Sequence, residues 1–348
     1  MADMEMRALG GSGLRVSSLA LGTMTFGGAG RHQAMGQVQV EEATAMVDAS
    51  LEVGVNLFDT ADVYSEGRSE EVLGKALGRR RHDVLVATKV QSPMRAEDGP
   101  NDRGQSRHHI LRGCEESLRR LGTDYIDLYQ VHSVDELTPM EETLRALDDL
   151  VRQGKVRYIG CSNYSAWHLM KALSISERHG WERYITHQAY YSLVGRDVEW
   201  ELVPLCLDQD LGLLVWSPLA GGLLSGQQQR GERAPEGSRR AVLGDTGTVD
   251  YDQAFDIVDV LREIASEREV SVAQVALNWV RQRPAVSSVM VGARRQEQLL
   301  DNLRAATWSL TGDEMARLDQ ASVRPLPYPY WHQHKNNAAR LAYHLQLP

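Results

Sequence analysis

Residues able to move protons stand where several predicted strands end. The run Val55–Phe58 is apolar enough for a buried strand, yet Asp59 and then Tyr64 follow it directly. A strand end that only turned the chain would use glycine or proline, whereas a carboxyl and a phenol transfer protons or hold polar ligands. Lys89 ends a second apolar run and His132 a third. Because the carboxyl ends of parallel strands meet on one side of a sheet or barrel, we expect these four side chains to converge.

Together the four side chains suit the reduction of a carbonyl group. The stem of Lys89 lies in an apolar run, so its ammonium needs a carboxylate partner, and Asp59 is the expected one. A neighbouring lysine cation should lower the pKa of Tyr64 from about 10 toward the range of a general acid. His132 can orient and polarise a carbonyl oxygen. No side chain supplies hydride, so the reaction would need a cofactor.

Each residue also has a plainer interpretation. Asp59 and Lys89 could form a structural ion pair, His132 could be a hydrogen-bonded rim residue, and Tyr64 could pack a loop. Four such residues at successive strand ends are harder to explain in this way. A different enzyme, an aldolase with Lys89 as its Schiff-base former, stays open at this point.

Composition limits the class of protein. The chain has 348 residues, 42% hydrophobic and 24% charged, as in an ordinary globular protein. A formal charge of −9 argues against general binding to nucleic acids or anionic membranes. No signal-like segment opens the chain, and Pro218 and several glycines break the longest apolar run, so we expect neither secretion nor a membrane span. Cys114, Cys161 and Cys206 are odd in number and far apart, which predicts reduced thiols in a cytoplasm and no readable metal site.

Eight apolar runs alternate with amphipathic segments. The runs are Leu19–Gly22, Val55–Phe58, Val84–Val90, Ile126–Val131, Val156–Gly160, Ile185–Ala189, Leu213–Trp216 and Val286–Val291. Helices are expected near Val40–Val53, from Ser69, and over Ser106–Leu121, Met140–Gln153, Ala166–Arg178, Glu199–Asp208 and Arg295–Ala305, with a long loop after the seventh strand. Eight equal units predict a TIM (β/α)8 barrel rather than an open, doubly wound sheet.

The domain organisation follows from this repeat. Residues 1–348 are expected to form one barrel domain, with a hairpin over Arg7–Val16 closing the barrel floor and two extra C-terminal helical segments. Two segments depart from the repeat. For residues 225–250 we expect a lid-like loop over a ligand. For the tail 322–348 we expect either a packed end or a substrate contact.

Other strand ends could hold a dinucleotide, although no G-x-G-x-x-G opens a βαβ unit, so a Rossmann site is not supported. Trp216 could stack on a nicotinamide ring. Ser162, Asn163 and Gln188 offer hydrogen bonds that match an amide, although Ser162 and Asn163 could simply begin a helix.

Two further segments could bind phosphates. The backbone N–H groups of Leu219–Gly222 could hold a pyrophosphate, since glycine permits close approach. Arg294 and Arg295 open the last barrel helix, where the helix dipole and guanidinium groups favour a phosphate; they could equally be surface arginines.

These motifs together resemble the aldo-keto reductase superfamily over nearly the whole chain. They occur in the family's order: LALGTMTFG, GVNLFDTADVYSEGRSEEVLGKAL, LVATK, YIDLYQVH, IGCSN, QAYYS, WSPLAGGLLSG and ARRQEQLLDN. The resemblance is nearer to bacterial sugar- and aldehyde-reducing members and to potassium-channel β subunits than to the aldose reductase branch. It implies the (β/α)8 barrel.

The resemblance also implies the roles of the site residues. Tyr64 would be the general acid, Lys89 and Asp59 its tuning pair, and His132 the residue that orients the carbonyl. NADPH would lie extended across the rim. The implied cofactor-binding residues are Gly22, Thr23, Met24, Asp59, Ser162, Asn163, Gln188, Trp216, Ser217, Pro218, Leu219, Gly221, Gly292, Arg294, Gln298, Asp301 and Asn302.

The resemblance assigns these residues to different parts of the cofactor. Ser162, Asn163 and Gln188 would bind the carboxamide, with Trp216 under the nicotinamide and the segment 217–221 on the pyrophosphate. Arg294, Gln298 and Asn302 would surround the adenosine phosphate, and Arg294 is the main argument for NADP over NAD.

The chain departs from the family pattern at two places. Gln227 stands where many relatives have lysine, which removes a positive charge near the phosphates, and Ser133–Asp135 stand where relatives often have proline.

From the residues and the resemblance together we expect a cytoplasmic, NADPH-dependent reductase of a small aldehyde or ketone. The alternative is a redox-sensing NADP(H)-binding regulatory protein like the potassium-channel β subunits.

Overall fold

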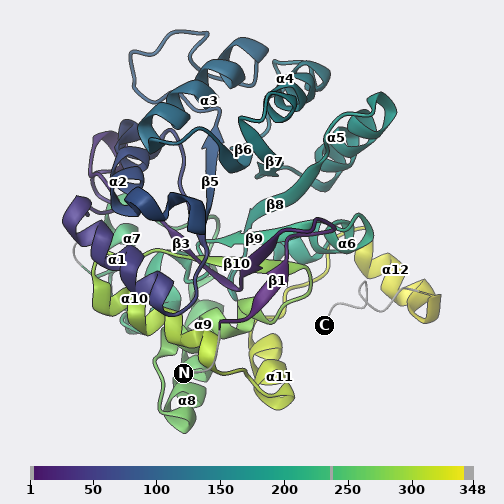
Figure 1. The fold of residues 1–348 in the computed structure, drawn as a ribbon. Helices are drawn as coiled ribbons and strands as arrows, with labels where there is room; N and C mark the ends of the chain where they lie inside the picture. Colours follow the sequence, from purple (N-terminus) through teal and green to yellow (C-terminus); the bar gives the residue numbers. More distant parts are fainter. Residues whose placement is uncertain (1–3, 236–237, 341–348) are drawn as a thin grey trace.

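The computed structural model describes residues 4–235 and 238–340, in which eight parallel strands close into a barrel surrounded by helices (Figure 1). The strands are β3 (Leu19–Gly22), β4 (Leu57–Asp59), β5 (Leu85–Val90), β6 (Ile126–Val131), β7 (Val156–Ser162), β8 (Tyr184–Tyr190), β9 (Gly212–Trp216) and β10 (Val286–Val291). The barrel closes because β10 pairs in parallel with both β9 and β3. The predicted fold class and all eight strands are confirmed, with some strand ends displaced by one or two residues.

Helices follow the first six barrel strands as predicted. They are α1 (Val40–Glu52), α2 (Arg68–Leu77), α3 (Arg107–Leu121), α4 (Met140–Arg152), α5 (Ala166–His179) and α6 (Leu202–Asp208). Caps at their ends explain the boundaries of α3 and α5. The hydroxyl groups of Ser106 and Ser165 accept hydrogen bonds from backbone N–H groups in the first turn, and Gly122 and Gly180 end the helices in the left-handed conformation.

The segment between β9 and β10 contains helices that were not predicted from the sequence. These are α7 (Arg239–Leu243), α8 (Tyr251–Arg268) and α9 (Val272–Arg281). Asp250 and Ser271 cap α8 and α9, and both helices place apolar residues at helical spacing against the barrel. The prediction of a long loop there was therefore too simple. The predicted lid, 225–250, includes α7, and its residues 236–237 lie outside the described part of the chain.

After β10 the chain forms α10 (Gln296–Leu303) and then two further helices, α11 (Gly312–Ala321) and α12 (Tyr330–Asn337). These last two are the extra C-terminal helical segments that the sequence predicted. The end of the predicted tail, residues 341–348, is not among the described residues.

A hairpin closes the lower end of the barrel, which faces the viewer in Figure 1. It pairs β1 (Met6–Ala8) with β2 (Arg15–Ser17), and Leu9, directly after β1, and Val16, within β2, are fully buried. These two side chains join one apolar cluster inside the barrel, with Ala20, Leu57, Ala87, Leu128, Leu214 and Met290. Since this end is filled with apolar side chains, polar chemistry is confined to the opposite end.

Other buried side chains of the barrel strands form a polar layer. Gln130, Thr186 and Ser288 are buried, and their side-chain polar atoms have no hydrogen-bond partner among the described residues. Gly160 provides the space for this layer, because a Cβ at this position would overlap the hydroxyl of Thr186. Such buried polar atoms are commonly satisfied by internal water.

This packing makes Gly160 a sensitive position. Gly160→Ala should lower the free energy of unfolding by about 2 kcal/mol or more, because the added methyl group overpacks the barrel interior. Gly312→Ala is the matched control, since no heavy atom lies within 4 Å of its added Cβ. Denaturant unfolding followed by circular dichroism should separate the two variants; equal stabilities would contradict this account of the interior.

Candidate active site

The four residues predicted as catalytic meet at the upper end of the barrel. Asp59 ends β4, Lys89 lies near the end of β5, and His132 follows β6 directly. Tyr64 begins a tight turn, Tyr64–Gly67, whose second and third residues adopt left-handed φ angles of 52° and 56°. This unusual turn lets a side chain five residues beyond β4 face back toward the strand ends.

Asp59 and Lys89 form a buried ion pair. The Lys89 side chain is fully buried, and its Nζ donates to Asp59 Oδ2 at 2.6 Å and to the carbonyl oxygen of Thr60 at 2.8 Å. Gln188 Nε2 donates to the other carboxylate oxygen at 2.9 Å. Burial acts to lower the pKa of Lys89, but the contacts with Asp59 and Tyr64 outweigh it and the pKa is raised. The ammonium therefore stays charged at neutral pH.

Tyr64 lies between this ammonium and an imidazole. Lys89 Nζ is 5.2 Å from the centre of the phenol ring, and the His132 ring is 5.8 Å away at an angle of 73°. Burial raises the pKa of Tyr64, while the positive charge of Lys89 opposes this rise. The expectation of a lowered pKa was wrong, because the cost of burying a phenolate exceeds the effect of one neighbouring cation. The phenol is therefore held in its protonated, proton-donating form.

The residues predicted to bind a carboxamide adjoin these four. Asn163 adopts a left-handed φ of 55°, donates to the carbonyl oxygen of His132 at 2.9 Å and accepts from Trp216 Nε1 at 3.1 Å. Ser162 Oγ donates to the carbonyl oxygen of Gln188 at 2.9 Å. The Trp216 ring lies 5.2 Å from that of Tyr190. One hydrogen-bonded network thus joins the ends of β6, β7, β8 and β9.

The loop after β9 has the backbone of an anion site. Ser217, Ala220, Gly221 and Gly222 all have left-handed φ angles, between 48° and 98°. Runs of such residues turn neighbouring N–H groups toward one side, where they can hold an anion. Ser217 Oγ is buried without a hydrogen-bond partner among the described residues, while Pro218 is buried and Leu219 half-buried.

Sequence reasoning missed a cation beside this loop, because it placed a lid there without assigning any of its side chains. Arg239, the first residue of α7, acts electrostatically on Tyr64 and Tyr190, and no hydrogen bond or ion pair joins its side chain to another described residue. Burial lowers its pKa. Its neighbour Arg240 is paired with Asp245 and so is not equivalent. The sequence signal that could have indicated this helix is Ser238, which caps α7 directly before Arg239.

The other predicted cofactor residues lie along β3 and α10. Thr23 is buried and hydrogen-bonded to the carbonyl oxygen of Asp59, with Gly22 and Met24 half-buried on either side. Gly292 is exposed after β10, beside Gly22.

On α10 the predicted residues differ in their partners. Arg294 Nε and Nη2 donate to the carbonyl oxygens of Met35 and Ala34, and Gln298 Oε1 accepts from the Arg294 N–H. Asn302 is buried, and Asp301 binds Ser271 and Gln274. The carboxylate of Asp301 thus has a structural role between α10 and α9.

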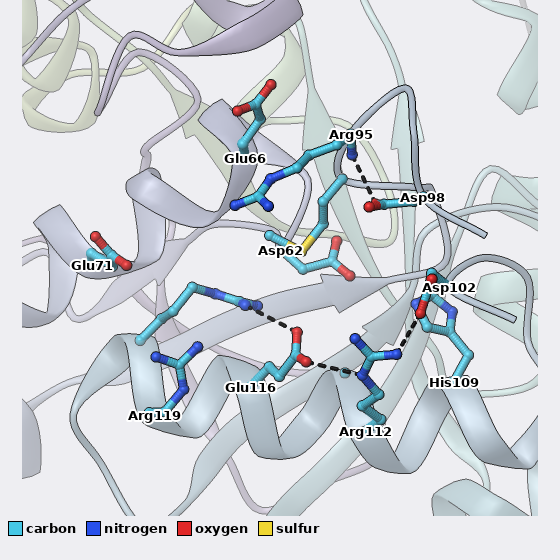
Figure 2. Close-up of a pocket in the computed structure, with 13 residues that line it drawn as sticks. Asp62, Glu66, Glu71, Arg95, Asp98, Asp102, His109, Arg112, Glu116 and Arg119 are labelled. Atoms are coloured by element: carbon cyan, nitrogen blue, oxygen red, sulfur yellow. Dashed lines mark hydrogen bonds and ion pairs between the residues drawn. The ribbon is translucent and has the colours of Figure 1, made fainter.

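A separate cavity of about 290 Å³ lies outside the barrel mouth, between α2, α3 and the loop after β5 (Figure 2). Six carboxylates and four arginines line it, and several pair with one another, such as Arg112 with Asp102 and Glu116. Asp62 lies at this cavity, almost fully buried, with one oxygen accepting from the backbone of Val63. None of the predicted catalytic four lines the cavity, so we do not place the active site there.

Comparison with known proteins agrees with this arrangement. Residues 18–323 match the family model described as "Aldo/keto reductase family". The chain is 40% identical over 333 residues to the uncharacterized oxidoreductase YrpG of Bacillus subtilis, covering 92% of this chain and 97% of that protein. It is 41% identical over 312 residues to a probable voltage-gated potassium channel subunit beta of Oryza sativa, covering 87% and 91%. It is 35% identical over 345 residues to versiconal hemiacetal acetate reductase of Aspergillus parasiticus, covering 94% and 99%.

The fold and these matches define a (β/α)8-barrel oxidoreductase. The chain belongs to the aldo/keto reductase family, whose members interconvert small carbonyl compounds and alcohols. Among the described residues, no helix combines the length and apolar character that a membrane crossing needs. The same residues contain no cluster of three or more histidine, cysteine or acidic side chains that could hold a metal ion.

The buried carboxyl of Asp62 gives a prediction about pH. Burial, and then the charge of Glu70, raise its pKa well above the ordinary value. The folded state therefore binds this proton more tightly than the unfolded chain. The resulting stabilisation is complete below about pH 4 and is lost as pH rises through the folded-state pKa.

Asp62→Asn should remove this loss of stability at higher pH, since asparagine keeps an oxygen for the Val63 N–H without a charge. The variant should be more stable than the wild type at neutral pH, and the difference should shrink toward pH 4. Glu177→Gln, at an exposed position of α5, is the control. Thermal midpoints across this range test the idea, and a difference independent of pH would refute it.

Proposed function

We propose that this protein reduces an aldehyde or ketone to an alcohol with NADPH, using Tyr64 as the proton donor. The observation that carries the proposal is the convergence of Tyr64, His132 and the buried Lys89–Asp59 pair at one barrel mouth. The proposal includes residues 1–348 as one barrel domain and residues 225–250 as a lid. The lid contributes Arg239 to the site.

The residues at the mouth fit a nicotinamide dinucleotide. The family generally uses such cofactors. Ser217 offers a buried hydroxyl, without a partner in the described part of the chain, at the start of a loop with anion-binding backbone geometry. Arg239 would supply a positive charge near the phosphates. This charge would compensate for the lysine that many relatives have where this chain has Gln227. Trp216, Asn163 and Gln188 would hold the nicotinamide end, and Arg294 the phosphate of the adenosine end.

The chain's own residues would then handle the oxygen and its proton. The bound cofactor supplies the hydride to the carbonyl carbon. His132 orients the carbonyl oxygen, and the phenol of Tyr64 donates its proton to that oxygen as the C–H bond forms. The Lys89 ammonium stabilises the phenolate that remains, and Asp59 holds the ammonium in place.

Tyr64→Phe tests the proton donor. The variant should bind NADPH normally and lose about 1,000-fold or more in kcat, because general acid catalysis is removed while the site keeps its shape. Tyr184→Phe is the matched control: its side chain is also buried, but it begins β8, at the other end of the barrel strands. Near-native kcat in Tyr64→Phe on any good substrate would disprove the assignment.

Arg294→Ala tests the cofactor preference. The dissociation constant should rise about tenfold for NADPH and little for NADH, because only NADPH carries the additional phosphate. Arg304→Ala, at an exposed position at the other end of α10, is the control. Fluorescence titrations with both cofactors give the answer, and equal weakening for the two cofactors would count against the proposal.

A second candidate function is regulatory. The similarity to potassium-channel β subunits at 41% and 38% identity favours a protein that holds NADP(H) and reports its redox state. Retention of cofactor through dialysis, with negligible turnover on a carbonyl panel, would favour this function over the reductase.

The aldolase alternative is disfavoured by the environment of Lys89. Its Nζ is fully buried and donates to Asp59 and Thr60, and its pKa is raised, so a nucleophilic neutral amine is not available. Borohydride in the presence of a carbonyl compound should trap no adduct on this lysine.

A further inference from the structure

The segment between β3 and α1 carries a second imidazole to the catalytic tyrosine. His32 ends a short turn, Gly30–His32, and only 7% of it is exposed. Its ring centre lies 5.5 Å from that of Tyr64, at an angle of 60°. This contact is as close as that of His132, at 5.8 Å. The sequence analysis gave His32 no role, since it lies ten residues beyond β3.

Backbone contacts fix this segment against the turn that carries Tyr64. Gly27 N–H donates to the carbonyl oxygen of Val38, which closes the segment at its base. Ser65 Oγ, in the catalytic turn, donates to the carbonyl oxygen of Phe26 at 2.8 Å. Gly30 lies so close to Glu66 that an added Cβ would overlap its carboxylate. The position of His32 is therefore set by contact with the catalytic turn itself.

Arg294, which directly precedes the N-cap of α10, holds the same segment. Its Nε donates to the carbonyl oxygen of Met35 at 2.9 Å, and its Nη2 donates to that of Ala34 at 3.1 Å. These carbonyl groups follow His32 by two and three residues. One guanidinium thus spans the gap between α10 and the segment that covers Tyr64.

The surroundings of Tyr64 are polar on several sides. Lys89 and Asp59 lie below the phenol, the imidazoles of His132 and His32 contact its ring, and Arg239 acts on it electrostatically. An imidazole offers one donor and one acceptor when neutral. A site with such walls should recognise a substrate that carries hydrogen-bonding groups next to its carbonyl.

We propose that His32 lines the carbonyl site and selects substrates with a hydroxyl group adjacent to the carbonyl, and that Arg294 is a positioning residue that holds His32 there. The inference rests on the proposed reductase function. It adds a substrate class to that function, the hydroxylated aldehydes and ketones, and gives Arg294 a task besides the cofactor phosphate.

The first test uses substrate pairs of equal size, glycolaldehyde with propanal and hydroxyacetone with butanone, at saturating NADPH. The wild type should prefer the hydroxylated member of each pair in kcat/KM. His32→Phe keeps a ring of similar size, loses both hydrogen-bonding atoms, and should reduce this preference about tenfold. His179→Phe is the control, because this histidine, the last residue of α5, also contacts an aromatic ring, that of Trp181.

The second test concerns Arg294 and needs no cofactor. In Arg294→Gln the backbone amides of residues 29–36 should exchange with deuterium about tenfold faster, because two hydrogen bonds to this segment are lost. Arg294→Lys should give an intermediate rate and Arg295→Gln the wild-type rate. With NADPH kept saturating, Arg294→Gln should also reduce the preference for hydroxylated substrates, an effect that the loss of a phosphate contact alone would not produce.

The outcomes separate the claims. An unchanged preference in His32→Phe would overturn the role of His32, and unchanged exchange in Arg294→Gln would overturn the role of Arg294 in positioning it. No turnover by the wild type on any carbonyl compound would overturn the proposed reductase, and the selection of substrates with it, whereas the exchange experiment would still decide whether Arg294 holds the segment.

Discussion

A fully buried ammonium is the constraint around which the barrel mouth is built. Lys89 cannot be solvated where it lies, so Asp59 and the carbonyl oxygen of Thr60 must receive its hydrogen bonds. Gln188 in turn satisfies the remaining oxygen of Asp59. One charge thereby ties together β4, β5 and β8. Buried ion pairs are not an efficient source of stability, so the position of this charge beside Tyr64 is the better reason for it.

The remainder of the barrel is arranged to keep that charge in place. Leu9 and Val16 of the hairpin close the lower end with apolar side chains, so solvent reaches the interior from the upper end. Gln130, Thr186 and Ser288 add buried polar side chains to the barrel strands. Several non-glycine residues with left-handed φ angles lie at the mouth, among them Ser65, Asn163 and Ser217.

The loops at the mouth connect distant parts of the chain. The segment that carries His32 touches the turn after β4 on one side and the start of α10 on the other. In the proposed reductase, a group near the adenosine end of the cofactor would in this way influence the surroundings of the carbonyl. The chain is similar both to a protein named as a reductase and to one named as a channel subunit.

The sequence by itself determined the barrel and the identity of its four central side chains. Apolar runs recur at regular spacing and several of them end in a polar residue, so the strands and their ends are local properties of the chain. Helices α8 and α9 could also have been predicted, since Asp250 and Ser271 are ordinary caps before apolar residues at helical spacing.

Only the tertiary structure decided how the site is tuned. The direction of the Tyr64 pKa depends on how deeply the phenol is buried, which no local pattern encodes. Arg294 meets Met35 across 259 positions of sequence, and His32 and Arg239 reach Tyr64 from segments with no regular repeat. Burial and contacts of this kind exist only after the barrel closes, because closure alone sets which loops share the mouth.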